Sequence, residues 1–334
     1  MPQAIADDRP IRWGILGAGW IAEQVAENIN LTSGNVIAAV AARSATRAAD
    51  FADRFDVAGS YGSYQALVND PEVDVVYVAT THPSHRALSL LAIEAGKAVL
   101  IEKPLCLNAR DAREVLTAAA SADVFAMEAM WMRTNPLIRK AQELITDGVI
   151  GDVVGVRSEF GLGLPFDPGH RLYDLDNGGG ALLDVGIYPV TFAYLFLGRP
   201  DEALTFGTVS PAGADDTVHL QWLYDGVPRA QLWCSASIPA PNAGVIFGTR
   251  GWLSFGSPMF RPTSLTVHSG EKEYRIEDPL AGQGAGYGPE VEEVERCLRA
   301  GLAESPLVTH ADTIAVLELL DRSRAALGVK YPSE

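Results

Sequence analysis

The sequence predicts an α/β domain with a doubly wound parallel sheet, followed by an α+β domain with an open, mostly antiparallel sheet. From Ile11 to about Met130, short apolar runs alternate with amphipathic segments, which is typical of repeated βα units. Beyond Gly151, short apolar runs follow one another through turns. A chain of 334 residues, 48% apolar, has enough material for two cores. We therefore expect domains at residues 1–130 and 131–334.

The elements of the first half follow from the period of the apolar residues. Strands are expected at Ile11–Leu16, Asn35–Ala42, Val73–Ala79, Ala98–Ile101 and Val124–Met130. Helices are expected at Ile21–Ile29, Ala45–Phe55, Ser63–Val68, Ser84–Ala95 and Ala109–Ala120. Asp70-Pro71 and Gly96 mark breaks between these segments.

The second half begins with a helix from Pro136 to about Asp147. Strands are then expected at Val153–Phe160, Ala203–Val209, Thr217–Tyr224, Arg229–Ala236, Gly244–Gly248, Trp252–Phe255 and Ser264–His268. Two helices, Pro289–Ala300 and Ala311–Leu327, end the chain as given.

The segment Gly17-Ala18-Gly19-Trp20-Ile21-Ala22 has the form G-x-G-x-x-A and lies between the first expected strand and the first expected helix. Glycines in this position allow a tight turn and a close approach of a pyrophosphate to a helix N-terminus. Together with the repeated βα pattern, the motif predicts a Rossmann domain that binds a dinucleotide through Gly17, Gly19, Trp20, Ile21 and Ala22.

The end of the second strand indicates which dinucleotide is bound. NAD sites place a carboxylate there for the ribose 2′-hydroxyl, but residues 41–47 contain none. Arg43 and Arg47, with Ser44 between them, suit a 2′-phosphate. NADP is therefore favoured, although NAD stays possible and both arginines would also be ordinary at an exposed helix start.

Glu102-Lys103-Pro104 follows the strand that ends at Ile101, at the edge of the sheet where open α/β folds bind ligands. A lysine buried there next to a cofactor can exchange a proton with substrate. Taken alone, Lys103 would more often be a surface residue.

A second group of candidates lies in the glycine-rich segment of residues 178–189. If the chain is helical after Ala181, Asp184 and Tyr188 share one helix face. They would then both hydrogen-bond one alcohol oxygen. The alternative is that the glycines cap a core helix and Asp184 is purely structural.

Taken together, four motifs resemble the glucose–fructose oxidoreductase / inositol dehydrogenase / rhizopine catabolism protein (Gfo/Idh/MocA) family. They are Gly17–Ala22, Ala79-Thr80-Thr81-His82-Pro83-Ser84-His85, Glu102-Lys103-Pro104 and Gly178-Gly179-Gly180-Ala181-Leu182-Leu183-Asp184. The resemblance covers nearly all of the chain. Within the family, the chain is similar to the branch of dimeric dihydrodiol dehydrogenase and NADP-dependent D-xylose dehydrogenase.

The resemblance implies roles for particular residues. It places Lys103 near the nicotinamide and the reacting carbon. Further cofactor contacts are expected at Thr80, His82, His85, Glu102, Arg133, Arg171 and Tyr287. Substrate contacts are expected at Trp131, Phe160, Asp184, Tyr188 and Trp252. Each aromatic residue would, by itself, more often belong to the core.

The expected reaction is an oxidation of a CH–OH group of a sugar, polyol or trans-dihydrodiol, with hydride transfer to C4 of the nicotinamide. Lys103, Tyr188 and Asp184 would carry the hydroxyl proton. Many relatives have histidine where this chain has Tyr188, so the proton donor is either Tyr188 or Lys103. Two alternatives are a dinucleotide-binding sensor without turnover and a reductase of an unsaturated bond.

The remaining features argue against other classes of protein. A formal net charge of −16 disfavours nucleic acid and anionic membranes. The cysteines Cys106, Cys234 and Cys297 form no C-x-x-C, and the six histidines lack metal-ligand spacing, so no metal is expected. With no readable signal segment and only a short apolar run, Val185–Leu197, a cytoplasmic protein is expected.

We also expect a homodimer through an exposed face of the second sheet, formed by Leu220, Trp222, Leu232 and Trp233.

Overall fold

The computed structural model describes residues 2, 4–6, 8–282, 284, 286–332 and 334. The chain folds into two compact units, and neither is one continuous segment. Unit 1 contains residues up to 134 and residues 282–314, and unit 2 contains residues 135–281 and 315–334. The sequence-based division into residues 1–130 and 131–334 did not anticipate that residues 282–314 return to unit 1. Periodicity along the chain does not show which core a late helix joins.

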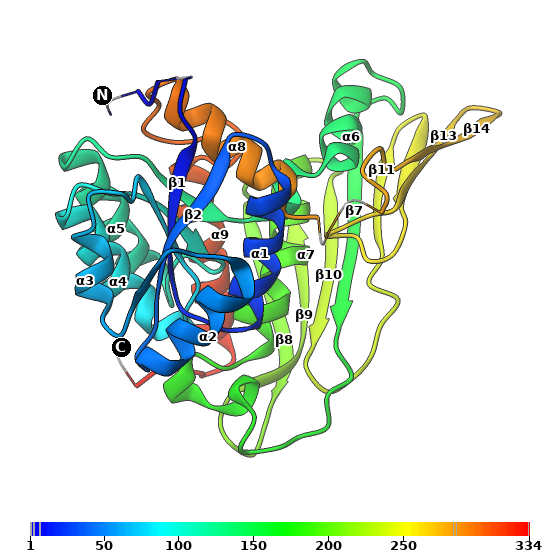
Figure 1. Cartoon of the computed structure of the whole chain (residues 1–334). Helices are drawn as coiled ribbons and strands as arrows, with labels where there is room; N and C mark the ends of the chain where they lie inside the picture. Colours follow the sequence, from blue (N-terminus) through cyan, green and yellow to red (C-terminus); the bar gives the residue numbers. More distant parts are fainter. Residues whose placement is uncertain (1, 3, 7, 283, 285, 333) are drawn as a thin grey trace. The chain divides into compact units, whose positions relative to one another are not determined.

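Unit 1 is built on a six-stranded parallel sheet in the order β3-β2-β1-β4-β5-β6 (Figure 1). Its strands are β1 (Ile11–Leu16), β2 (Asn35–Ala41), β3 (Gly59–Tyr61), β4 (Val75–Val78), β5 (Ala98–Glu102) and β6 (Ala126–Ala129). The strand order reverses between β1 and β4, so the carboxyl ends of these strands form the crevice where such sheets bind ligands.

The helices of unit 1 lie close to their expected positions. They are α1 (Trp20–Leu31), α2 (Ala45–Phe55), α3 (Tyr64–Val68), α4 (His82–Glu94), α5 (Ala109–Ser121), the 3₁₀ turn η1 (Trp131–Thr134) and α8 (Gly288–Arg299). Helix α9 (His310–Ala326) begins in unit 1 and continues into unit 2. Strand β3 was not expected, because three residues at a sheet edge show no readable alternation.

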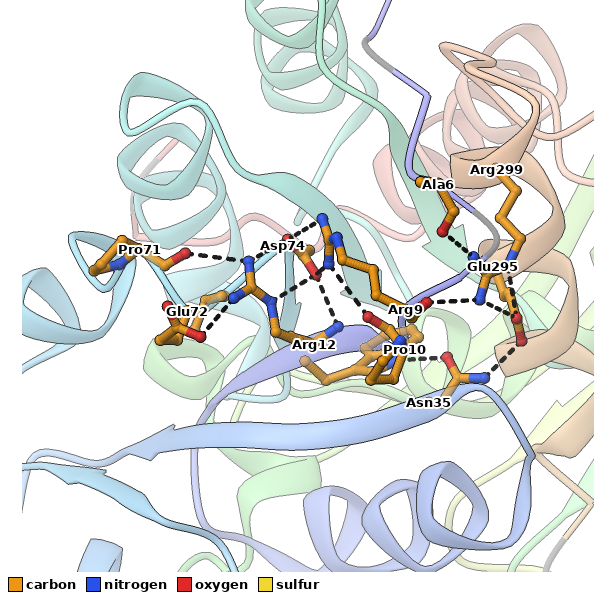
Figure 2. Close-up of polar contacts among 12 residues, drawn as sticks. Ala6, Arg9, Pro10, Arg12, Asn35, Pro71, Glu72, Asp74, Glu295 and Arg299 are labelled. Atoms are coloured by element: carbon orange, nitrogen blue, oxygen red, sulfur yellow. Dashed lines mark hydrogen bonds and ion pairs between the residues drawn. The ribbon is translucent and has the colours of Figure 1, made fainter.

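Charged side chains attach α8 to the amino ends of the first two strands (Figure 2). Glu295 of α8 accepts hydrogen bonds from Asn35 of β2 at 2.7 Å and from Arg299 at 2.8 Å. Arg299 also donates to the carbonyl oxygens of Ala6 and Arg9. The contact between Asn35 and Glu295 joins residues 260 positions apart in the chain. They help to place the returning segment in unit 1.

Unit 2 contains an eight-stranded sheet in the order β14-β13-β12-β11-β7-β10-β9-β8 (Figure 1). Its strands are β7 (Val153–Gly161), β8 (Glu202–Val209), β9 (Asp215–Leu223), β10 (Arg229–Ser235), β11 (Gly244–Gly248), β12 (Gly251–Phe255), β13 (Ser264–Ser269) and β14 (Lys272–Glu277). All neighbours are antiparallel except β7 and β10. The α+β prediction is confirmed. Strand β14 was not expected, because its residues are mostly exposed and polar.

The remaining helical elements of unit 2 lie before β7 and between β7 and β8. They are α6 (Pro136–Thr146), the 3₁₀ turns η2 (Arg171–Tyr173) and η3 (Leu175–Asn177), the π-helical turn η4 (Leu182–Gly186) and α7 (Ile187–Leu197). Helix α7 packs on β7 and β10, and Phe192 contacts Phe255 of β12 edge to face. The core of unit 2 therefore lies between α7 and one face of the sheet.

Four residues were expected on the exposed face of the second sheet: Leu220, Trp222, Leu232 and Trp233. For the first three this prediction was wrong. Leu220, Trp222 and Leu232 are 4%, 1% and 2% exposed and belong to the core. Because successive strand residues point to opposite faces, Trp233 lies on the other side from Leu232. There Trp233 contacts His219 edge to face, with ring centroids 6.2 Å apart.

The segment Leu175–Leu197 is the one described helical stretch long and apolar enough to cross a membrane. It is longer than the run expected from the sequence, because the turns η3 and η4 precede α7. In its most apolar window, 78% of the residues are buried within the fold. This degree of burial is that of a core helix.

Candidate dinucleotide and substrate sites

The glycine turn after β1 has the geometry that a pyrophosphate needs. Gly17 has φ +112°, and a Cβ there would lie 2.5 Å from the carbonyl oxygen of Ala79. A Cβ on Gly19 would meet nothing within 4 Å. Gly17 thus allows the close approach of β1 and β4, whereas Gly19 leaves open space beside the turn.

The first turn of α1 keeps its amide groups available. Gly19 is the N-cap residue, and no side chain among the described residues caps the helix. Ala22 is fully buried, as expected for the third small residue of the motif, whereas Trp20 is 70% exposed. Ile21 is partly buried. An uncapped helix start next to open space suits an anionic group.

The start of α2 presents two exposed arginines beside this turn. Ser44 is the N-cap residue of α2 and accepts a hydrogen bond from the backbone N–H of Arg47. The Arg47 guanidinium donates to the carbonyl oxygen of Ala18 at 2.7 Å. Arg43 is also exposed. The structure therefore brings Arg47 to the glycine turn, as a 2′-phosphate site requires.

The segment after β4 contains an unsatisfied polar atom and a fully buried histidine. Within the described residues, the Thr80 hydroxyl oxygen is buried without a hydrogen-bond partner. The His85 ring lies between the carbonyl oxygens of Pro104, 2.9 Å from Nδ1, and Thr80, 3.1 Å from Nε2. Burial lowers the pKa of His85. His85 thus braces the two loops, while His82, buried at the start of α4, contacts the His85 ring edge to face.

Glu102, Lys103 and Pro104 lie at the carboxyl end of β5, and the peptide bond between Lys103 and Pro104 is cis. Lys103 is partly buried. The Glu102 carboxylate accepts hydrogen bonds from the Tyr77 hydroxyl at 2.5 Å and from the Lys103 backbone N–H at 3.0 Å. Burial raises the pKa of Glu102 to about 7, despite these bonds.

Sequence reasoning missed two buried carboxyl groups near this loop. Glu128 of β6 accepts from the Leu105 backbone N–H and the Thr313 hydroxyl. Glu290 of α8 is fully buried, and neither of its oxygens has a hydrogen-bond partner among the described residues. Burial raises the pKa of both, that of Glu290 most strongly. Only the return of α8 to unit 1 brings Glu290 here.

The aromatic and basic candidates after β6 form a packed group within unit 1. Trp131 and Tyr287 stack with ring centroids 4.4 Å apart. Arg133 is 8% exposed and pairs with Asp312 at 2.5 Å, and its Nε is buried without a partner in the described part of the chain. Helix packing thus brings Tyr287 to Trp131 and Asp312 to Arg133, although the members of each pair are distant in sequence. Their expected contacts with cofactor or substrate stay predictions.

In unit 2, Asp184 lies in a π-helical turn rather than in the expected α-helix. The turn η4 spans Leu182–Gly186, and α7 begins at Ile187. Asp184 is 7% exposed and pairs with Arg171 through contacts of 3.0 and 3.2 Å. Arg171, expected to bind cofactor, is therefore an ion-pair partner of Asp184. Single π turns are frequent at functional sites.

Tyr188 belongs to an aromatic cluster with Phe160 and Phe260. Their ring centroids lie 4.6 to 5.7 Å apart, and Phe160 and Phe260 are stacked. Phe260 was not a candidate, because no motif contains it. Trp252 was expected beside the substrate, but it is 43% exposed and stacks on His268. By strand alternation it lies on the face opposite to Leu253 and the core.

The residues of unit 1 fit a bound dinucleotide. The space beside Gly19 would receive the pyrophosphate, Arg43 and Arg47 a 2′-phosphate, and the Thr80 hydroxyl would gain a partner. No group of three or more His, Cys, Asp or Glu side chains suited to a metal is found among the described residues. The absence of a metal from the active protein stays a prediction.

A reversing parallel sheet, an uncapped glycine turn and a lysine at a neighbouring strand end define a Rossmann-type, dinucleotide-dependent oxidoreductase. Comparison with family models makes the assignment specific. Residues 11–130 match the oxidoreductase family with an NAD-binding Rossmann fold, and residues 138–254 match the Gfo/Idh/MocA C-terminal domain. The chain belongs to the Gfo/Idh/MocA family of NAD(P)-dependent dehydrogenases and reductases, as the motifs implied.

Curated relatives match along almost the whole chain. The trans-1,2-dihydrobenzene-1,2-diol dehydrogenase of Mus musculus is 38% identical, and the alignment covers 97% of this chain and 99% of the relative. The enzyme of the same name from Homo sapiens is 36% identical with the same coverage. The resemblance to the dihydrodiol dehydrogenase branch is therefore confirmed.

Solved structures support the same fold. The 3-ketoreductase KijD10 from Actinomadura kijaniata, in complex with NADP and TDP-benzene, superposes with a TM-score of 0.83 at 25% identity. That match covers 95% of this chain and 98% of KijD10. An aldose-aldose oxidoreductase from Caulobacter crescentus gives 0.86 at 22% identity, covering 96% and 98%.

Proposed function

We propose that this protein is an NADP-dependent dehydrogenase that oxidises a CH–OH group of a trans-dihydrodiol, sugar or polyol. The observation that carries the proposal is Lys103 at the carboxyl end of β5, in a chain 36–38% identical to dihydrodiol dehydrogenases. A lysine at this edge of a dinucleotide-binding sheet is suited to exchange a proton with an alcohol. The dihydrodiol is the first substrate to test.

The preference for NADP rests on the basic start of α2. Arg43 and Arg47 are exposed there, and Arg47 is held at the glycine turn by its bond to Ala18. A planar guanidinium is well suited to a phosphate monoester. The presence of NADP in the KijD10 complex is consistent with this choice for a related fold.

We propose that Lys103, Tyr188 and Asp184 act together on the substrate hydroxyl. When bound, the dinucleotide supplies the hydride acceptor at its nicotinamide ring. Oxidation of the alcohol to a carbonyl releases one hydroxyl proton, for which the Lys103 amine or the Tyr188 hydroxyl would serve as acceptor. Asp184, already paired with Arg171, would orient the substrate hydroxyl.

A spectrophotometric screen tests the function. Purified protein is incubated with NADP or NAD and with trans-dihydrodiols, pentoses, hexoses and inositols, and the absorbance of the reduced nicotinamide is followed. We expect turnover with NADP and at least one CH–OH substrate, and a clear preference for NADP over NAD. Dinucleotide binding without turnover on any of them would favour a sensor instead.

We further propose that the protein works in the cytoplasm as a homodimer. Its net charge of −16 disfavours nucleic-acid and anionic membrane partners. The dimer is proposed to form through the face of the unit 2 sheet opposite to α7, which contains Trp233 and the exposed Phe247.

A further inference from the structure

The glycine turn that precedes Asp184 is held by a distant part of unit 2. Tyr331 is 2% exposed, and its hydroxyl donates to the carbonyl oxygen of Gly179 at 2.9 Å. Arg324 of α9 lies over the Tyr331 ring, 4.4 Å from its centroid, and pairs with Glu334. The Arg324 guanidinium thus packs against the Tyr331 ring and holds it in place, so that the Tyr331 hydroxyl points toward the Gly179 carbonyl.

A second side chain holds the same segment from the sheet. Asp215 is fully buried at the start of β9, and its Oδ2 accepts from the Leu182 backbone N–H at 2.6 Å. Leu182 is the first residue of the π turn. Gly180 has φ +122°, and a Cβ there would collide with the Asp215 carboxylate. Only glycine allows this approach.

Backbone hydrogen bonds join the glycine turn of residues 178–180 to the segment that contains Arg171. Gly179 donates to the Asp174 carbonyl at 2.9 Å, and Gly180 donates to the Leu172 carbonyl at 2.8 Å. A Cβ on Gly179 would lie 2.8 Å from three carbonyl oxygens of residues 171–174. Arg171 then reaches across to Asp184. A displacement of the glycine turn would therefore move both members of the ion pair.

We propose that Tyr331 and Asp215 are positioning residues for the reaction. They hold the turn of residues 178–180 and the π turn so that Asp184 and Arg171 keep their orientation toward the substrate hydroxyl. The inference rests on the proposed function, because it assigns Asp184 to the substrate. The Tyr331 hydroxyl bonds to the backbone of Gly179 and the Asp215 carboxylate to the backbone of Leu182, so each acts through the backbone of the turn.

Replacing Tyr331 with Phe removes the hydroxyl and keeps the ring under Arg324. Because misplacement of a catalytic group by a fraction of an ångström is costly, we expect kcat/KM to fall about tenfold. The dissociation constant of NADP, which binds unit 1, should stay within about twofold. Tyr224→Phe is the matched control, since Tyr224 also donates to a glycine carbonyl, that of Gly198 at 3.0 Å. Equal effects of the two variants would overturn the proposal.

A double-mutant cycle separates positioning from general stability. If Tyr331 acts through Asp184, then Tyr331→Phe should change kcat/KM by less than about twofold in an Asp184→Asn background. The same tenfold loss in both backgrounds would contradict the proposal. Asp215→Asn weakens the second anchor and should reproduce the loss of kcat/KM if Tyr331→Phe fails to fold. Full activity of Asp215→Asn would count against the inference.

Hydrogen–deuterium exchange gives a readout that does not need turnover. Amides of residues 178–186 should exchange faster in Tyr331→Phe than in the wild type or in Tyr224→Phe. Unchanged exchange there would refute the positioning role. A wild type without turnover on any substrate would refute the proposed function, and the exchange result would still decide whether Tyr331 holds the turn.

Discussion

At the scale of single residues, the buried side chains around Lys103 explain how this lysine is positioned. Glu102 is tied to Tyr77 and to the Lys103 backbone, and His85 braces Pro104 against Thr80. These contacts fix the backbone on both sides of Lys103. The side chain is thus presented from a rigid support, which favours proton transfer at a defined position.

Lys103→Met tests this role directly. The change removes the exchangeable proton and keeps most of the side-chain volume, so kcat should fall by about two to four orders of magnitude. NADP affinity should stay largely intact, because the pyrophosphate and 2′-phosphate contacts lie elsewhere. Stopped-flow absorbance and fluorescence titration measure the two quantities. Turnover at the wild-type rate would exclude Lys103 from the chemistry.

At the scale of elements, unit 1 is stabilised by an ion-pair cluster at the amino ends of its strands (Figure 2). Asp74, just before β4, accepts hydrogen bonds from Arg9 and from the side chain and backbone of Arg12. Burial alone would raise the pKa of Asp74, but the hydrogen bonds from Arg12 and Arg9 lower it to about 2. The carboxylate therefore favours the folded state when it is ionised.

Asp74→Asn should reduce the free energy of unfolding at pH 7 by about 1 to 2 kcal/mol, allowing for solvent around Arg9. Because the folded-state pKa is depressed, the stabilisation is complete above about pH 4 and is lost as the pH falls toward 2. Urea unfolding of both proteins at several pH values measures this. The difference between them should shrink in acid. A difference independent of pH would show that Asp74 acts through shape alone.

Strands and helices were predicted well where the apolar pattern is long. The α2 range 45–55 was predicted without error, whereas β3 and β14 were missed. The π turn at Leu182–Gly186 was also missed. A π turn differs from an α-helix by one residue in its hydrogen bonds, and side-chain periodicity over five residues does not report that difference.

At the scale of the whole molecule, the unit 2 sheet has one face covered by α7 and another that presents partly exposed aromatic side chains. Phe206, Phe247 and Trp252 are 61%, 38% and 43% exposed. By strand alternation they lie on the side away from the core. Exposed aromatic groups across several strands favour an interface with a second copy of the chain.

Light scattering at micromolar concentration should give twice the chain mass of 35.7 kDa. Phe247→Glu places a charge in the proposed interface and should shift the protein to monomers, because an unpaired charge buried there costs several kcal/mol. Val227→Glu is the control, since Val227 is 72% exposed in a turn of the same unit. A monomeric wild type would refute the proposed dimer. If Phe247→Glu stayed dimeric, the interface would not include Phe247.

The sequence by itself determined the class of this protein, because the evidence for it is local. The G-x-G-x-x-A turn, the basic segment after β2 and the Glu102-Lys103-Pro104 motif are each a few adjacent residues whose backbone chemistry follows from their order. The tertiary structure alone decided the long-range partners: Arg171 with Asp184, Trp131 with Tyr287, and Tyr331 with Gly179. Burial and contacts between distant segments depend on how elements pack, and a one-dimensional pattern does not encode that packing in readable form.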